Sequence, residues 1–118
     1  MIEHVAAWVS DLERARAFYE RWFGTKAGPR YESARRPFQS HFLSFGQGAR
    51  LELLAAPQEA ARLSHIAVSV GSREAVDALV ERMRAEGVRI VGEPRETGDG
   101  YYEATIADSE GNGVEITG

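Results

Sequence analysis

The chain has 118 residues, of which 43% are hydrophobic and 27% charged, and its formal net charge is −4. A single globular domain fits this length and composition, whereas the acidic balance argues against a nucleic-acid partner and no apolar run reaches the roughly 20 residues of a membrane span. The N-terminus lacks the layout of a signal peptide and the chain has no cysteine, so we expect a cytoplasmic protein in which any metal ligands are nitrogen and oxygen atoms.

The first half of the chain predicts one strand, one helix and three further strands. Residues 2–9 are apolar and rich in β-branched and aromatic side chains, which is typical of a strand. Ser10 and Glu13 have the spacing of a capping box, so a helix is predicted from there to a stop at Gly24. Its apolar residues recur at helical spacing and predict a buried stripe of Leu12, Ala15, Tyr19, Trp22 and Phe23. The later strands are predicted at residues 26–31, 38–45 and 49–55.

The second half of the chain repeats this order. Residues 63–70 predict a strand, and Ser72 is the expected cap of a helix that ends at Gly87. Strands are predicted at residues 88–91, 101–107 and 114–117, and the turn between the last two is assigned to Asn112 and Gly113. We therefore expect one α+β domain over residues 1–118, built from two β-α-β-β-β modules, residues 1–56 and 63–118, that a short linker at 57–62 joins.

The repeat gives each module one histidine and one glutamate at matching places. His4 and His65 lie near the start of the first strands, 61 residues apart, and Glu52 and Glu115 lie inside apolar runs, 63 residues apart. An unpaired carboxylate in such a run is costly. Two neutral imidazoles and two carboxylates neutralise a divalent cation, and they suit nickel, zinc, manganese, cobalt or ferrous iron. The four residues therefore predict a metal site, although any one of them alone fits a half-exposed polar face; His41 has no counterpart and is interpreted as structural or exposed.

The two modules, the four ligands on first and last strands, and the segment DSEGNGVEI near the end resemble the vicinal oxygen chelate superfamily. It includes glyoxalase I, extradiol dioxygenases, methylmalonyl-CoA epimerase, fosfomycin resistance enzymes and bleomycin resistance proteins. The resemblance covers essentially the whole chain. It implies a glyoxalase-like α+β fold in which curved mixed sheets surround a cleft.

Within this superfamily, the residue at position 52 discriminates between members. Extradiol dioxygenases and fosfomycin resistance enzymes use a set equivalent to His4, His65 and Glu115, the epimerase has glutamine in place of Glu52, and bleomycin resistance proteins generally lack the metal set. By ligand pattern the sequence is similar to bacterial glyoxalase I. This resemblance implies a lyase or isomerase, with nickel or zinc as the favoured metal, in which a glutamate abstracts a proton and an enediolate is held on the metal. Glu115 is the predicted base and Glu52 the second choice.

Four further residues are predicted to contact a small-molecule substrate. Trp8 stands where bacterial glyoxalase I usually has an arginine for the glutathione carboxylate, so we expect a substrate other than the glutathione hemithioacetal; core packing is the equal alternative for this ring. Arg50 shares a strand face with Glu52 and is a candidate for an anionic group, or else for a salt bridge. Tyr101 and Glu103 lie on the more polar side of their strand, where an exposed edge would explain them as well.

Two other functions stay open from the sequence. One is a non-catalytic protein that sequesters an aromatic or apolar compound, as drug resistance proteins do, and it would not need both glutamates on a metal. The other is an extradiol-type dioxygenase, which the fourth ligand disfavours. Similar small bacterial proteins are usually homodimers whose sites take ligands from both chains, so the resemblance also implies a homodimer.

Overall fold

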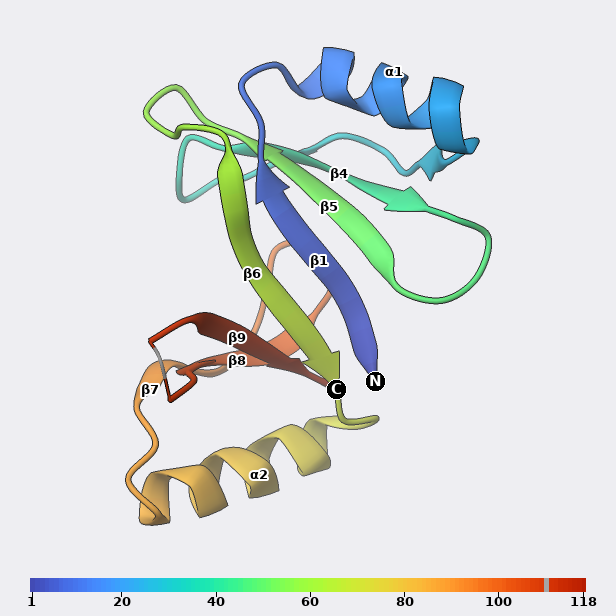
Figure 1. The fold of residues 1–118 in the computed structure, drawn as a ribbon. Coiled ribbons are helices and arrows are strands. Elements are labelled where there is room, and N and C mark those ends of the chain that lie inside the picture. Colours follow the sequence, from blue (N-terminus) through green and yellow to red (C-terminus); the bar gives the residue numbers. More distant parts are fainter. Residues whose placement is uncertain (110) are drawn as a thin grey trace. The chain divides into compact units, whose positions relative to one another are not determined.

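The computed structural model describes residues 1–109 and 111–118 and contains two helices and nine strands in that part of the chain (Figure 1). Its internal contacts divide it into two compact units. The N-terminal unit is Glu3–Ser64, and the C-terminal unit is His65–Gly118 with Met1–Ile2. Each unit has a mixed sheet and one helix, so the predicted α+β class and the internal repeat are confirmed.

The N-terminal unit has a mixed sheet in the order β2-β4-β5-β1, with β3 beside β4. Strands β1 and β5 are parallel, and β4 is antiparallel to β5. The predicted strand at residues 26–31 is wrong in one respect, because it is split into two short strands around Pro29, which cannot donate to a strand ladder. The elements are β1 (Ile2–Trp8), α1 (Leu12–Phe23), β2 (Lys26–Ala27), β3 (Tyr31–Glu32), β4 (Gln39–Ser44) and β5 (Arg50–Ala55).

Helix α1 lies across one face of this sheet (Figure 1). The expected cap at Ser10 is wrong by one residue: Asp11 is the N-cap, and its carboxylate accepts a hydrogen bond of 3.0 Å from the backbone N–H of Arg14. Gly24 ends the helix with φ of 65°, as predicted.

The buried stripe of α1 is shorter than the sequence predicts. Leu12 joins a core with Leu43 and Leu53, and Ala15 and Tyr19 pack against it. Trp22 and Phe23, in contrast, are 61% and 60% exposed. The strand that follows this end of the helix, β2, has only two residues, so it offers little sheet surface for the two rings to cover.

The C-terminal unit repeats the arrangement with the sheet order β6-β9-β8-β7, in which β6 and β9 are parallel. Helix α2 lies along one face of it (Figure 1), capped by Ser72 as predicted, whose hydroxyl accepts a hydrogen bond of 3.1 Å from the Ala75 N–H. The core contains Val76, Val80 and Ile116. The elements are β6 (Arg62–Ser69), α2 (Arg73–Ala85), β7 (Ile90–Glu96), β8 (Tyr102–Ala107) and β9 (Gly113–Thr117), so β7 begins and ends later than the predicted strand.

The predicted hairpin between the last two strands is confirmed, but its turn differs from the expected one. The loop lies between Ala107 and Gly113, and Gly111, with φ of 87°, takes the left-handed conformation that favours glycine. Asp108 closes the loop by accepting hydrogen bonds from the backbone and side chain of Asn112. Glu110 of the DSEGNG segment lies outside the described residues.

Strand pairing places both glutamates on the sheet face opposite the helix of their own unit. Side chains alternate along a strand, and directly paired residues share a face. Leu53 packs toward α1, so Glu52 points the other way. Ile116 packs toward α2, so Glu115 also points away from the helix. In the described part of the chain, no helix is long and apolar enough to cross a membrane.

Candidate metal and active site

The N-terminal unit brings His4 and Glu52 together on the sheet face opposite α1. In the parallel pairing of β1 with β5, Glu52 is paired with Ala6, two residues after His4. The His4 Nε2 atom lies 3.7 Å from the Glu52 Oε1 atom. Both residues are buried, at 2% and 5% exposure, so water does not solvate the carboxylate and its charge has to be compensated within the site.

The C-terminal unit forms the same pair from equivalent positions. Glu115 on β9 is paired with Ala67, two residues after His65 on β6. The His65 Nε2 atom lies 3.2 Å from the Glu115 Oε2 atom, and both side chains are mostly buried. Each unit therefore holds its glutamate beside its histidine through the same register, which is the arrangement that the sequence repeat predicts.

The distances within the two pairs test whether these residues fit a metal. Two ligand atoms that are each about 2.0–2.2 Å from one ion are roughly 3–3.6 Å apart, and the pairs measure 3.7 Å and 3.2 Å between nitrogen and oxygen. The separation in the first pair is longer than a hydrogen bond. Imidazole nitrogen and carboxylate oxygen are also ligands that nickel, zinc, cobalt, manganese and iron accept. The residues of each unit thus fit as half of a ligand set.

Arg50 lies next to this site, in an ion pair. It is paired with His4 in the strand register, and its Nε donates a hydrogen bond of 3.1 Å to the Glu3 Oε1 atom. The other Glu3 oxygen contacts His4 Nδ1. Burial raises the pKa of Glu3, but the hydrogen bonds from His4 and Arg50 outweigh burial and hold the pKa of this carboxyl below its ordinary value. The structure therefore contains the salt bridge that the sequence offered as the alternative for Arg50.

Glu103 is a second carboxyl group beside Glu115. It lies on β8, two residues before Thr105, the direct partner of Glu115, so the two glutamates share a sheet face. Glu103 is 7% exposed, and its Oε2 atom has no hydrogen-bond partner among the described residues. Burial, repulsion by Glu115 and a hydrogen bond with Glu115 raise the pKa of Glu103 to about 8. Tyr101 precedes β8, where its backbone N–H donates a hydrogen bond to the Thr97 hydroxyl.

Trp8 belongs to a cluster of aromatic rings at the end of β1. Its ring meets the Phe38 ring edge-on at 6.4 Å between centroids, and Phe38 in turn lies 5.9 Å from Tyr31. The Arg62 guanidinium lies 5.8 Å from the Trp8 ring centre. Since Trp8 is four residues after His4 on β1, its side chain lies on the same sheet face as His4, the one opposite α1.

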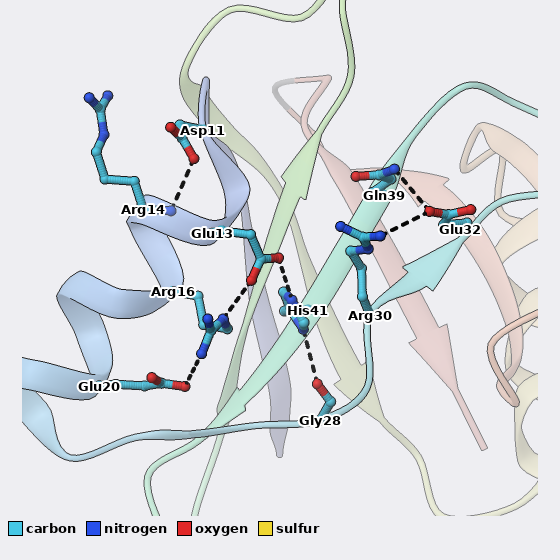
Figure 2. Close-up of polar contacts among 10 residues, drawn as sticks. All are labelled: Asp11, Glu13, Arg14, Arg16, Glu20, Gly28, Arg30, Glu32, Gln39 and His41. Atoms are coloured by element: carbon cyan, nitrogen blue, oxygen red, sulfur yellow. Dashed lines mark hydrogen bonds and ion pairs between the residues drawn. The ribbon is translucent and has the colours of Figure 1, made fainter.

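His41 is a structural residue, which is one of the two interpretations that the sequence left for it. Figure 2 shows its ring between α1 and the chain before β3, where Nδ1 lies 2.9 Å from the Gly28 carbonyl and Nε2 lies 2.8 Å from the Glu13 carboxylate. Hydrogen bonds from Arg16 and His41 lower the pKa of Glu13. His41 therefore points toward the helix, away from Glu52.

Sequence reasoning missed two residues near the site. Glu3 is adjacent to a predicted ligand, but alternation along a strand places its side chain on the other face, so the pattern gave no reason to select it. Ser40 is fully buried, and its hydroxyl has no hydrogen-bond partner among the described residues. A serine in an alternating strand is too common to be a signal.

Comparisons with known proteins identify the family and the fold of the chain. A family model described as the Glyoxalase/Bleomycin resistance protein/Dioxygenase superfamily matches residues 1–116. No curated protein matches the sequence. Among solved structures, methylmalonyl-CoA epimerase from Mycobacterium tuberculosis has a TM-score of 0.84 and 22% identity, over 98% of this chain and 85% of that chain.

Two further structures have the same fold. The hypothetical protein BH1468 from Bacillus halodurans C-125 has a TM-score of 0.84 and 19% identity, over 99% of this chain and 92% of that chain. A Streptomyces coelicolor methylmalonyl-CoA epimerase variant in complex with 2-nitronate-propionyl-CoA has a TM-score of 0.81 and 22% identity, over 98% and 94%. These likenesses confirm the glyoxalase-like α+β fold.

Proposed function

Because the chain belongs to the Glyoxalase/Bleomycin resistance protein/Dioxygenase superfamily, we propose that it is a metal-dependent isomerase or lyase that removes a proton from a carbon next to a carbonyl group. The observation that carries the proposal is the histidine–glutamate pair that each unit forms through the same register. Divalent metal binding is typical of the superfamily. Several similar structures are epimerases by name, and an epimerase inverts a carbon.

The metal ligands in this proposal are His4, Glu52, His65 and Glu115. Together they would neutralise a dication, and their nitrogen and oxygen donors favour nickel or zinc, with manganese, cobalt and ferrous iron as alternatives. When bound, such an ion acts as a Lewis acid and stabilises the negative charge that develops on a substrate oxygen.

Glu115 is the proposed base and Glu52 the second choice. The Glu115 side chain is 17% exposed and Glu52 only 6%, so Glu115 is the more accessible of the two to a substrate proton. A carboxylate within hydrogen-bond reach of that proton can accept it and later return it. Glu103 holds a proton at a higher pH than an ordinary carboxyl group and lies beside Glu115, where it donates a hydrogen bond toward the base.

The proposed substrate is a small molecule with an apolar or aromatic part, and not the glutathione hemithioacetal. Trp8 and its neighbouring rings present an apolar surface on the site face. Arg50 is already paired with Glu3, so binding an anionic substrate group there would compete with that ion pair. Substrate contacts by Tyr101 and Glu103, a cleft between curved sheets, and a homodimer stay predictions.

Two measurements in sequence test the proposal. The first is elemental analysis of the purified chain and of apo-protein refilled with nickel, zinc, manganese, cobalt or ferrous iron, with Glu52→Ala and Glu115→Ala beside it. Glu86→Ala is the control, because Glu86 is exposed at the end of α2. We expect about one metal per chain in the wild type and the control and a clear loss in both site variants.

The second measurement follows proton abstraction itself. The protein is incubated in heavy water with a panel of acyl-CoA thioesters, α-hydroxy ketones and the glutathione hemithioacetal. NMR then follows the exchange of carbon-bound hydrogen for deuterium in each compound. This exchange reports proton abstraction even when the product of the reaction is not known. Exchange that needs both metal and Glu115 supports the proposal. A wild type that holds none of the five metals would overturn it and would favour the sequestering protein, for which alanine at either glutamate should leave ligand affinity intact.

A further inference from the structure

We propose that Glu3 is a positioning residue that fixes the orientation and tautomer of the His4 ring, and that Arg50 holds Glu3 in place. This inference deepens the proposed function and rests on it for its purpose, because His4 is one of the proposed ligands. The contacts that support the inference all lie within the N-terminal unit.

Both oxygens of the Glu3 carboxylate make contacts, one with His4 and one with Arg50. Oε2 contacts Nδ1 of His4, and Oε1 accepts hydrogen bonds from Nε and Nη2 of Arg50. Neighbouring residues in a strand normally point to opposite faces, so the Glu3 side chain has to turn back across β1 to reach the imidazole. Arg50 explains why it does so, because Arg50 is the register partner of His4 on β5 and draws the carboxylate toward that strand.

Phe42 contacts both His4 and Arg50, so the four side chains of Glu3, His4, Arg50 and Phe42 form a closed set of contacts. The Arg50 guanidinium lies 4.2 Å from the centre of the Phe42 ring, and the Phe42 ring meets the His4 ring edge-on at 5.1 Å. Glu3 therefore touches His4 on one side and Arg50 on the other, and Phe42 does the same. A side chain held from two directions has few other rotamers available.

These contacts determine which nitrogen of His4 faces the site. A carboxylate oxygen accepts hydrogen bonds, so the proton shared with Glu3 belongs to Nδ1. In the neutral imidazole, Nε2 then has the lone pair. Nε2 is the atom on the Glu52 side, at 3.7 Å from its carboxylate. Carboxylate partners of this kind orient histidine ligands in metal sites and strengthen them as donors.

The second module has no equivalent arrangement in its sequence. The position matching Glu3 is Ser64, directly before His65, and the position matching Arg50 is Gly113, two residues before Glu115. Neither residue can supply a carboxylate or a guanidinium. The two histidines of the proposed ligand set are therefore supported differently, and only His4 should respond to changes at positions 3 and 50.

The experiment compares the wild type with Glu3→Ala, Glu3→Gln and Arg50→Gln. Glu59→Gln is the matched control, because Glu59 also forms an ion pair with an arginine of the same unit, Arg62, at 2.6 Å. Nitrogen NMR spectra of apo-protein with labelled histidine give the tautomer of each ring, and a His4→Gln variant assigns the signals. Competition with a chelating dye gives the zinc dissociation constant, and thermal unfolding confirms that each variant folds.

We expect the Nδ1–H tautomer of His4 in the wild type and in the Glu59→Gln control. Glu3→Ala should lose this preference and weaken zinc binding about 10–100-fold, with Arg50→Gln changing both in the same direction. Glu3→Gln keeps the size of the side chain but removes its negative charge. If this variant weakens zinc binding as much as Glu3→Ala does, the loss of affinity is due to the missing charge.

An unchanged His4 tautomer in folded Glu3→Ala protein would overturn the inference. So would an unchanged zinc dissociation constant in the Glu3 variants when the wild type binds zinc. If the wild type binds no metal, the proposed function fails, and the tautomer spectra of the apo-protein still decide whether Glu3 positions His4.

Discussion

Replacing Glu103 by glutamine should stabilise the metal-free protein at alkaline pH and leave it unchanged at acidic pH. The pKa of Glu103 is raised from 4.5 to about 8, first by burial and then by Glu115. Below about pH 4.5 the folded and unfolded chains both hold this proton. Between that value and about pH 8 the unfolded chain releases the proton while the folded chain keeps it, so stability falls as the pH rises.

The size of the effect follows from the same pKa. At 1.36 kcal/mol per pKa unit, a value of about 8 in place of 4.5 corresponds to an upper limit of about 5 kcal/mol. Glu115 shares the repulsion and can relax or take up a proton itself, so a gain of about 2–3 kcal/mol for Glu103→Gln is the expected result. Glutamine preserves the shape and can still donate to Glu115.

The assay is urea unfolding of wild type, Glu103→Gln and the exposed control Glu86→Gln, with chelator present, at several values from about pH 5 to about pH 9. The free energy of unfolding of the wild type should decline across this range relative to that of Glu103→Gln. Parallel profiles for the two proteins would refute the reasoning, because they would mean that folding does not change the affinity of Glu103 for its proton.

Three further predictions concern the fold and use the same unfolding measurement. Leu43→Ala should cost about 2–5 kcal/mol, because Leu43 is fully buried against α1, and a cost below about 1 kcal/mol would contradict that burial. Asp11→Ala should cost about 1 kcal/mol and Ser10→Ala close to none, since Asp11 is the N-cap; the reverse order would restore the sequence-based cap. Trp22→Ser should change stability by no more than about 0.5 kcal/mol, because the ring is 61% exposed.

The sequence predicts the order of elements well because hydrophobic periodicity repeats in both halves. The stop at Gly24 and the cap at Ser72 were found from local chemistry that needs no tertiary context. The wrong predictions concern features that depend on tertiary contacts. Trp22 fits a helical stripe as well as Leu12 does, but the periodicity does not show that Leu12 is buried and Trp22 is 61% exposed. The turn before β9 likewise depends on which glycine the loop uses for its positive φ.

The candidate site is predictable to the extent that the repeat reveals it. The similar spacings of 61 residues between the histidines and 63 between the glutamates select His4, Glu52, His65 and Glu115. The structure adds the strand register that places each histidine beside the glutamate of its unit. The partner of Arg50 could not be predicted, because Glu3 reaches it by turning against the alternation of its strand.

The two modules have different residues at one buried position on the sheet face that carries the glutamates. Ser40 and Glu103 are equivalent, since each lies two residues before the strand partner of its unit's glutamate. Both are buried, and each has an oxygen without a hydrogen-bond partner among the described residues; Thr25 is the third such residue. A buried hydroxyl of this kind costs stability, and a buried carboxyl group costs more when it ionises. The repeat scaffold accommodates a serine at this position, so the fold itself does not require a carboxyl group there. The repeat therefore does not need a carboxyl group here for packing, and we expect Glu103 to act in the chemistry of the proposed site.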